Sequence, residues 1–185
     1  MRKILLILTA LFMSVAVFAQ KITTSGGITS GNKYYIGATT GSNDFYFYVD
    51  GSAKTASIKG VAKTDKEDAV ALTFTAVTGG WTIQFENGLY LGIKNAKDNG
   101  AVQVVEDAVV WTIDEDNDLL KLHPNDYYLQ KNNSGTQFGS FKNTQTNVWL
   151  ESAGGATPVS AILESIVIKG AATKMAYEVG EAFDP

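Results

Sequence analysis

Short runs of large apolar side chains alternate with polar residues over positions 33–152, and Gly, Asn and Asp separate the runs. The alternation has the two-residue period of a strand, and no window keeps the 3.6-residue period of a helix for three turns. β-branched and aromatic residues dominate the runs, which suits a pleated, half-buried surface. The pattern predicts an all-β domain.

Two features of this region recur in phase. A turn pair followed by alternating large side chains begins at Asn43, Asn87 and Asn125, and an aromatic residue after a strand-like step recurs at spacings of 37 and 38 residues. Three four-strand units around a pseudo-threefold axis would bury these aromatics and leave few sheet edges, whereas three propeller blades are too few to close. We therefore predict a β-trefoil over residues 33–152. Its predicted core residues are Phe74, Leu91, Trp111, Leu129 and Trp149.

The first nineteen residues have the pattern of a secretory signal peptide. Arg2 and Lys3 precede an apolar run over residues 4–17. Residues 17–19 (VFA) then place small residues at the positions that a signal peptidase recognises. The run is too short to span a bilayer comfortably, and no cysteine follows it, which argues against a lipoprotein anchor. We expect cleavage after Ala19, no membrane insertion of the mature chain, and a location outside the cell, at its surface or in the periplasm. An uncleaved anchor is the alternative.

The segments flanking the β domain differ from it in composition. Residues 20–32 are small and polar and predict a loose lead-in, and residues 153–162 predict a linker. A new strand is expected at 163–170. The motif Y-x-V-G-x-x-F-D-P at 177–185 resembles the opening of a bacterial Ig-like domain, and residues 163–185 are too few to complete one. The resemblance implies a larger modular secreted surface protein of Bacteroidetes type.

Charge and reactive residues argue against several functions. The chain has 15 basic and 19 acidic residues, and loss of Arg2 and Lys3 would leave a net charge of −6. An acidic chain without a basic cluster is a poor ligand for nucleic acid or anionic membranes. With no cysteine, a single histidine and no G-x-S-x-G motif, neither a Cys-His nor a Ser-His triad is supported. We expect no catalytic site and no cofactor in this chain.

Two polar features could bind a metal ion but fit that role poorly. His123 stands in a predicted surface turn without partners at metal-ligand spacing. Asp114, Asp116 and Asp118 alternate as in a calcium loop, but the glycine and the bidentate glutamate of such a loop are missing. A solvated turn is the preferred interpretation of residues 114–118, with a weak calcium site as the alternative.

The second copy of the repeat is similar to the ricin B-type lectin family. Residues 87–93 (NGLYLGI) resemble the family's G-x-C-L-D-V strand, residues 101–105 its third strand, and residues 109–113 its Q-x-W strand. The resemblance covers residues 33–152. It implies a β-trefoil with sugar sites, each built from an Asp, an aromatic platform and polar residues before the Trp.

The positions implied for such sites keep suitable residues in the third copy. The second copy has Gly92, Val105, Ala108 and Val109 at these positions, and the first has Tyr48, Ala71 and Leu72. The ligand-binding candidates in the third copy are Gln130, Phe138, Phe141, Thr146 and Asn147. Strand alternation also turns Tyr46, Tyr90 and Tyr128 away from the core face, where they could stack on a ligand.

Three functions remain open on this evidence. The preferred one is a non-catalytic recognition module that binds a glycan. The alternatives are a structural spacer without its own ligand, and an accessory to a catalytic domain beyond residue 185. Convergence of Gln130, Phe141 and Asn147 on one exposed pocket would favour binding, and scattered or buried positions would favour the spacer.

Overall fold

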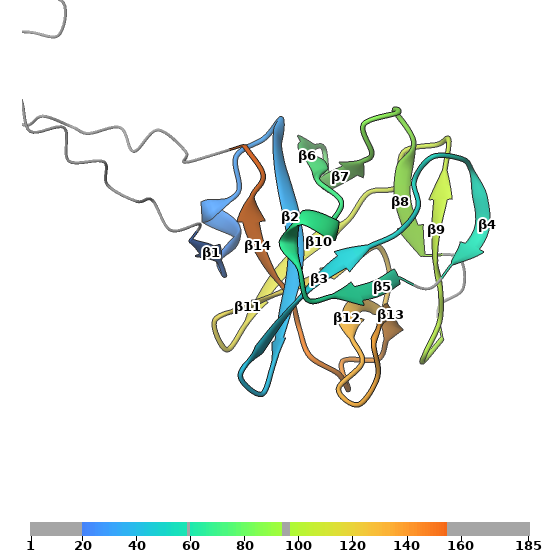
Figure 1. Ribbon diagram of the computed structural model, residues 1–185. Helices are drawn as coiled ribbons and strands as arrows, with labels where there is room; N and C mark the ends of the chain where they lie inside the picture. Colours follow the sequence, from blue (N-terminus) through green and yellow to red (C-terminus); the bar gives the residue numbers. More distant parts are fainter. Residues whose placement is uncertain (1–19, 59, 94–96, 155–185) are drawn as a thin grey trace, which may run out of the picture. The chain divides into compact units, whose positions relative to one another are not determined.

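A computed structural model describes residues 20–58, 60–93 and 97–154, and it confirms an all-β domain (Figure 1). The predicted signal peptide, most of the linker and the Ig-like segment lie outside the described residues. Two 3-10 turns, η1 (Ser25–Gly27) and η2 (Lys66–Asp68), accompany the strands. The strands are β1 (Lys21–Ile22), β2 (Asn32–Thr40), β3 (Asn43–Tyr48), β4 (Thr55–Ile58), β5 (Gly60–Lys63), β6 (Leu72–Val77), β7 (Gly80–Gln84), β8 (Tyr90–Ile93), β9 (Val102–Val105), β10 (Thr112–Asp116), β11 (Leu119–His123), β12 (Tyr128–Lys131), β13 (Gln137–Phe141) and β14 (Trp149–Ser152).

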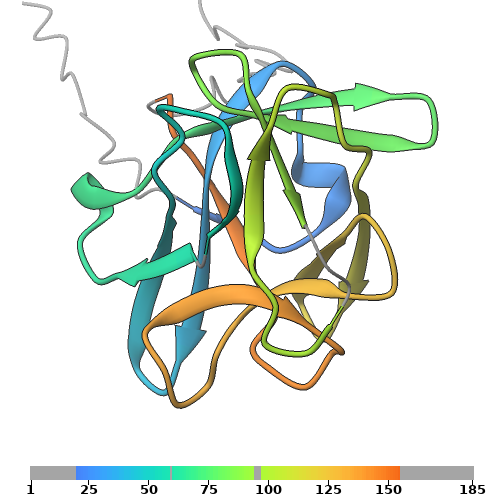
Figure 2. The ribbon, with the colours of Figure 1, turned by 90° about the vertical axis from the view of Figure 1, so that its right-hand side faces the viewer.

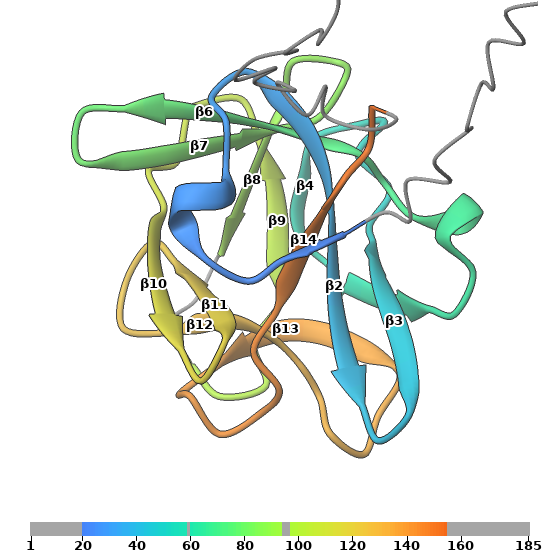
Figure 3. The same cartoon turned by 90° about the vertical axis from the view of Figure 1, so that its left-hand side faces the viewer.

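Six of these strands pair in a ring. β2 pairs with β6 and β14, β6 pairs with β7, and β10 pairs with β11, all antiparallel. Two isolated bridges complete the ring, one between Trp81 and Trp111 and one between Leu120 and Val148. Figure 3 shows β14 beside β2, with β10 and β11 on its other side. The first long strand and the last strand therefore meet.

Three further hairpins pair with one another. They consist of β3 with β5, β8 with β9, and β12 with β13. β13 pairs with β5, and β9 pairs with β4, which lies between β3 and β5 in the sequence. A bridge between Gly100, just before β9, and Ser140 on β13 joins the other two hairpins, so the three units contact one another (Figure 2). The ring and the hairpins bury a common core between them.

The repeated aromatics lie in this core. Phe74, Trp111 and Trp149 are at most 1% exposed, and Leu91 and Leu129 are fully buried. Both buried indoles have hydrogen-bond partners: Trp111 Nε1 donates to the Leu91 carbonyl at 2.9 Å, and Trp149 Nε1 donates to Thr39 Oγ1 at 3.0 Å. Trp149 lies against Gly37, where any side chain would overlap its ring. These five residues stand where the sequence pattern placed them.

The structure has two strands that the sequence pattern did not predict. β1 lies in the expected loose lead-in and pairs Lys21 with Glu151 and Ile22 with Leu150. β5 follows β4 and pairs with β3 and β13. Both strands exist because they cover the edge of a strand distant in sequence, an effect that local alternation does not report.

Candidate functional site

Strands β10, β11 and β12 present polar side chains on one face of the sheet. Asp114 pairs with Lys121, and Leu122 pairs with Leu129, which turns the leucines to the core and the residues beside them outward. The outward side chains lie in rows because residues two apart share a face. We call this set, together with Asn147, the polar face; its members are Asp114, Asp116, Lys121, His123, Tyr128, Gln130 and Asn147.

Two side-chain contacts cross from β10 to β11 within the polar face. Lys121 Nζ forms an ion pair with Asp116 Oδ2 at 2.8 Å, and His123 Nε2 lies 2.9 Å from Asp114 Oδ2. His123 Nδ1 lies 2.6 Å from the Asn125 carbonyl oxygen. Both nitrogens of the imidazole therefore face oxygen atoms.

Tyr128 supplies the aromatic surface of the polar face. Its ring centroid lies 4.7 Å from that of His123, and Lys121 Nζ lies 5.8 Å from the ring centroid. The side chain is half-buried. An aromatic ring bordered by carboxylate and amide groups offers what a sugar needs, since the ring packs against C–H groups and the polar groups bond hydroxyls.

Gln130 is the buried member of the polar face. It is 0% exposed, and its Nε2 donates to Asn147 Oδ1 at 2.6 Å and to the Gln145 carbonyl at 3.0 Å. The backbone N–H of Gln145 donates back to Gln130 Oε1 at 3.3 Å. Asn147 Nδ2 in turn donates to Asp116 Oδ2 at 3.4 Å. Gln130 therefore positions Asn147, and the half-buried Asn147 is the group that a ligand could reach.

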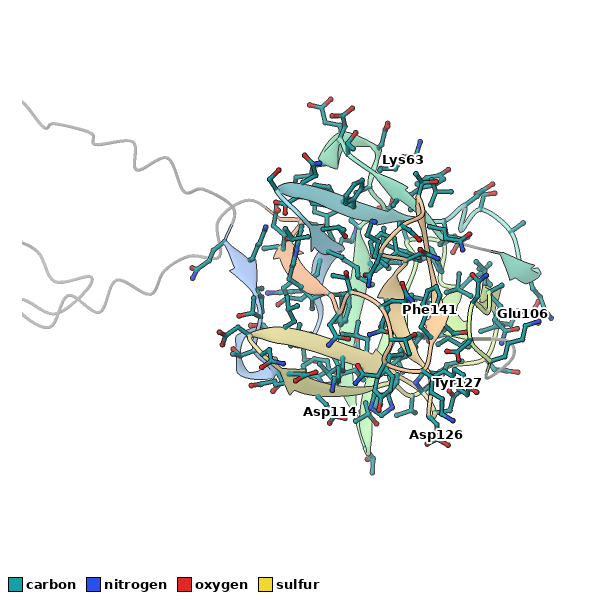
Figure 4. All side chains as sticks on the ribbon, turned by 90° about the horizontal axis from the view of Figure 1, so that it is seen from below. Lys63, Glu106, Asp114, Asp126, Tyr127 and Phe141 are labelled. Carbon is teal, nitrogen blue, oxygen red and sulfur yellow. The ribbon has the colours of Figure 1, made fainter. Side chains whose placement is uncertain are left out.

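The structure corrects the predicted aromatic platform. Phe138 is 0% exposed and packs edge-on against Phe47 with a centroid distance of 5.5 Å, and Phe141 is 3% exposed. Neither ring can lie beneath a ligand, because almost none of its surface is exposed. Figure 4 shows Phe141 near the middle of the molecule seen from below, with Asp114 and Asp126 at its edge.

Thr146 is directed into a local contact. Its Oγ1 donates to Asn133 Oδ1 at 2.5 Å, and its backbone pairs with Lys131. Of the five predicted ligand-binding residues, the structure brings Gln130 and Asn147 together and places Phe138, Phe141 and Thr146 in other contacts. Of the three residues whose convergence would favour binding, Gln130 and Asn147 meet and Phe141 is buried.

The acidic run at 114–118 is a strand followed by a two-residue hairpin turn. Asn117 and Asp118 have positive φ values of 50° and 59°, as tight antiparallel hairpins require. Asp114 and Asp116 point to the same face and are paired with His123 and Lys121. Within the described part of the chain, no three His, Cys, Asp or Glu side chains cluster as a metal site.

The equivalent positions of the other two copies lack such a face. Tyr46 corresponds to Tyr128, and its hydroxyl donates to Glu151 Oε2 at 3.0 Å. Gly92 corresponds to Gln130, and a Cβ there would crowd Val109 and Gln103. Tyr48, at the position of Gln130 in the first copy, is 36% exposed and has a phenol where Gln130 has a buried amide.

Sequence reasoning named Tyr128 as a ring that could stack on a ligand, but it missed four members of the polar face as sugar contacts: Asp114, Asp116, Lys121 and His123. A signal for them existed in the two-residue spacing of 114 and 116, of 121 and 123, and of 128 and 130, with tight turns between the strands. Which strands pair, and in which register, decides that these rows lie together.

A shallow recess of about 230 Å³ lies elsewhere, between the first and second copies. Its floor is apolar, with Val70 and Phe85, and Ser52, Glu86 and Asn87 are at its rim. The Asn87 amide already donates to the Gly51 carbonyl, and Glu86 pairs with Lys33 at 3.2 Å. The recess therefore has fewer polar side chains than the polar face.

No helix in the described ranges is both long and apolar enough to cross a membrane. No family model matches the sequence, and no curated protein matches it. Among solved structures, the fold is similar to a ricin B-like lectin of Macrolepiota procera in complex with lactose, with a TM-score of 0.51 and 21% identity over 68% of this chain and 97% of that one. The lysenin pore also aligns, with a TM-score of 0.48 and 13% identity over 75% of this chain and 50% of that one. The likeness to the lectin is one of fold, and the chain has a ricin B-like architecture.

Proposed function

From its ricin B-like fold and its polar face, we propose that this chain is a non-catalytic, carbohydrate-binding β-trefoil. We further propose that a signal peptide over residues 1–19 exports it and that it is the N-terminal part of a larger modular protein. The observation that carries the proposal is the polar face itself. It places hydrogen-bonding amide and carboxylate groups, Asn147 and Asp116, beside the half-buried ring of Tyr128.

Asn147 and Tyr128 are the expected contacts with the sugar. The amide of Asn147 is oriented from behind by Gln130 and can exchange its 3.4 Å bond to Asp116 for a sugar hydroxyl. Tyr128 offers a ring face to the C–H side of a pyranose. Gln130 contributes by holding Asn147 in place.

The test is a glycan array probed with the full chain, followed by titration of the best hit. We expect Asn147→Ala and Tyr128→Ala each to weaken binding at least about tenfold, equivalent to about 1.4 kcal/mol. Tyr90→Ala, at the equivalent position of the second copy, and Asn43→Ala, at the exposed start of β3, are the matched controls and should bind like the wild type. Circular dichroism of each variant checks that the fold is intact.

The structural spacer remains the second candidate, and one observation favours it. Both Nε2 and Oε1 of Gln130 have hydrogen-bond partners inside the protein, as in a network that serves stability alone. Absence of binding to any glycan class on the array would overturn the lectin proposal and leave the spacer. Equal binding by the Tyr128 and Tyr90 variants would place any sugar site away from the polar face.

A further inference from the structure

The basic side chains of the polar face are already paired with carboxylates. Lys121 lies 2.8 Å from Asp116, and His123 lies 2.9 Å from Asp114. An acidic sugar bound here would need to displace one of these carboxylates before it could make an ion pair of its own. Lys121, the cation of this face, is already neutralised by Asp116 and therefore offers little to a uronate or a sulfate.

The groups around the two pairs increase the negative charge. The Lys121 side chain is 18% exposed, whereas those of Asp116 and Asp114 are 34% and 56% exposed, so the carboxylates are the more accessible partners. Asp118 in the β10–β11 turn and Asp126 in the β11–β12 turn border the same strands and are exposed. An anionic ligand would therefore approach a face bordered by like charges.

The other nearby lysines do not compensate for this charge. Lys131 on β12 is 2% exposed, and its ammonium donates to the Asn132 and Gly135 carbonyls at 2.8 and 3.1 Å. Lys142 opens the loop that leads to Asn147 and is exposed. Its backbone N–H donates to the Asp98 carboxylate at 2.6 Å, which brings another negative charge to that loop.

We infer that the polar face selects neutral sugars and rejects uronic acids and sulfated sugars. This inference rests on the proposed function, since it names the class of glycan that the same site accepts. Asp116 is the residue that sets the selection. It neutralises Lys121, which would otherwise be available to an acidic sugar, and it also contacts Asn147.

The test uses matched pairs of probes: galactose-, N-acetylgalactosamine- and glucose-terminated disaccharides, each in neutral form and with a 6-sulfate or a 6-carboxylate. The wild-type protein should bind each acidic member at least about tenfold more weakly than its neutral partner. Raising the salt concentration should narrow this ratio, because it screens the repulsion.

A charge-neutral variant tests the role of Asp116. Asp116→Asn leaves Lys121 without its partner and should shift the acidic-to-neutral affinity ratio at least about tenfold toward the acidic probes. Glu115→Gln is the matched control, because it removes the same charge from the same strand, where the carboxylate bonds Ser25 instead of a member of the polar face. The control should leave the ratio unchanged.

The outcomes separate the two proposals. Equal or tighter binding of acidic probes by the wild type, or an unchanged ratio in Asp116→Asn, would overturn the selection inferred here while leaving a carbohydrate-binding function intact. Binding of neither member of any pair would overturn the proposed function itself.

Discussion

Gln130 lies with its side chain completely enclosed and with its amide bonded to Asn147 and to the backbone of Gln145. Burying an amide is unfavourable unless its donors and acceptor find partners, and here they all do. The neighbouring Lys131 follows the same rule: burial lowers the pKa of its ammonium, which two carbonyl oxygens and the Phe45 ring solvate in place of water. At this scale the third copy is organised by satisfied buried polar groups.

Replacement of Gln130 should reveal this contribution to stability. Gln130→Ala leaves the side-chain carbonyl of Asn147 and the backbone N–H of Gln145 without their partner. We therefore expect the free energy of unfolding to fall by about 1–3 kcal/mol. Urea denaturation followed by tryptophan fluorescence measures it. Gln103→Ala, on the half-buried face of β9, is the control and should change the free energy by no more than about 0.5 kcal/mol. A Gln130→Ala change as small as that of the control would contradict the argument.

At the scale of elements, β14 joins the beginning of the domain to its end. It pairs with β1 and β2, and its buried Glu151 accepts a hydrogen bond from Tyr46 on β3 and pairs with Lys66 on η2. Desolvation by burial, followed by the hydrogen bond to Glu151 and the charge of that carboxylate, raises the pKa of Tyr46 to about 12. Because ionised Tyr46 would face a buried carboxylate, the folded state favours the protonated phenol.

The raised pKa predicts an alkaline limit to stability. A folded-state pKa above the unfolded value of 10.0 stabilises the protein fully below pH 10, and this contribution is lost as the pH rises from 10 towards 12. Tyr46→Phe should therefore make the free energy of unfolding less dependent on pH between 10 and 12. The same variant compared from pH 7 to 8 is the control, because the phenol is protonated there in both states and the two slopes should agree. A wild-type slope equal to that of the variant between pH 10 and 12 would refute the prediction.

At the scale of the whole molecule, closure of the ring depends on the pairing of β14 with β2. Four residue pairs, from Trp149 with Gly37 to Ser152 with Tyr34, form that ladder. Trp149 and Leu150 also fill the core, at 1% and 0% exposure. Without β14, this edge of β2 would therefore lack its partner strand.

Two truncations test this dependence. A chain that ends at Val148 lacks β14 and should lose cooperative thermal unfolding, because an open edge and a cavity in the core remain. A chain that ends at Gly155 keeps every described strand and is the control, expected to melt in one transition. Circular dichroism on heating measures both. A cooperative transition in the shorter chain would show that the ring closes without β14.

The fold class and the core could be predicted from the chain's local pattern. Phe74, Trp111 and Trp149 recur at fixed spacing, and alternation along each strand assigns one face inward, so their burial could be predicted from local pattern alone. The resemblance to the ricin B-type lectin family, and not the alternation, singled out Gln130 and Asn147 in the third copy, and these are the two predicted site residues that meet.

The composition of the polar face and the position of the remaining strands depend on contacts between segments distant in sequence. Pairing of Asp116 with Lys121 depends on the register of β10 with β11, and burial of Phe138 depends on β5, a strand some seventy-five residues earlier in the sequence. Local alternation specifies which side chains share a face but not which strand covers that face. Long-range pairing therefore buried the predicted Phe platform and left Tyr128 half-buried on the polar face, beside His123 and Lys121.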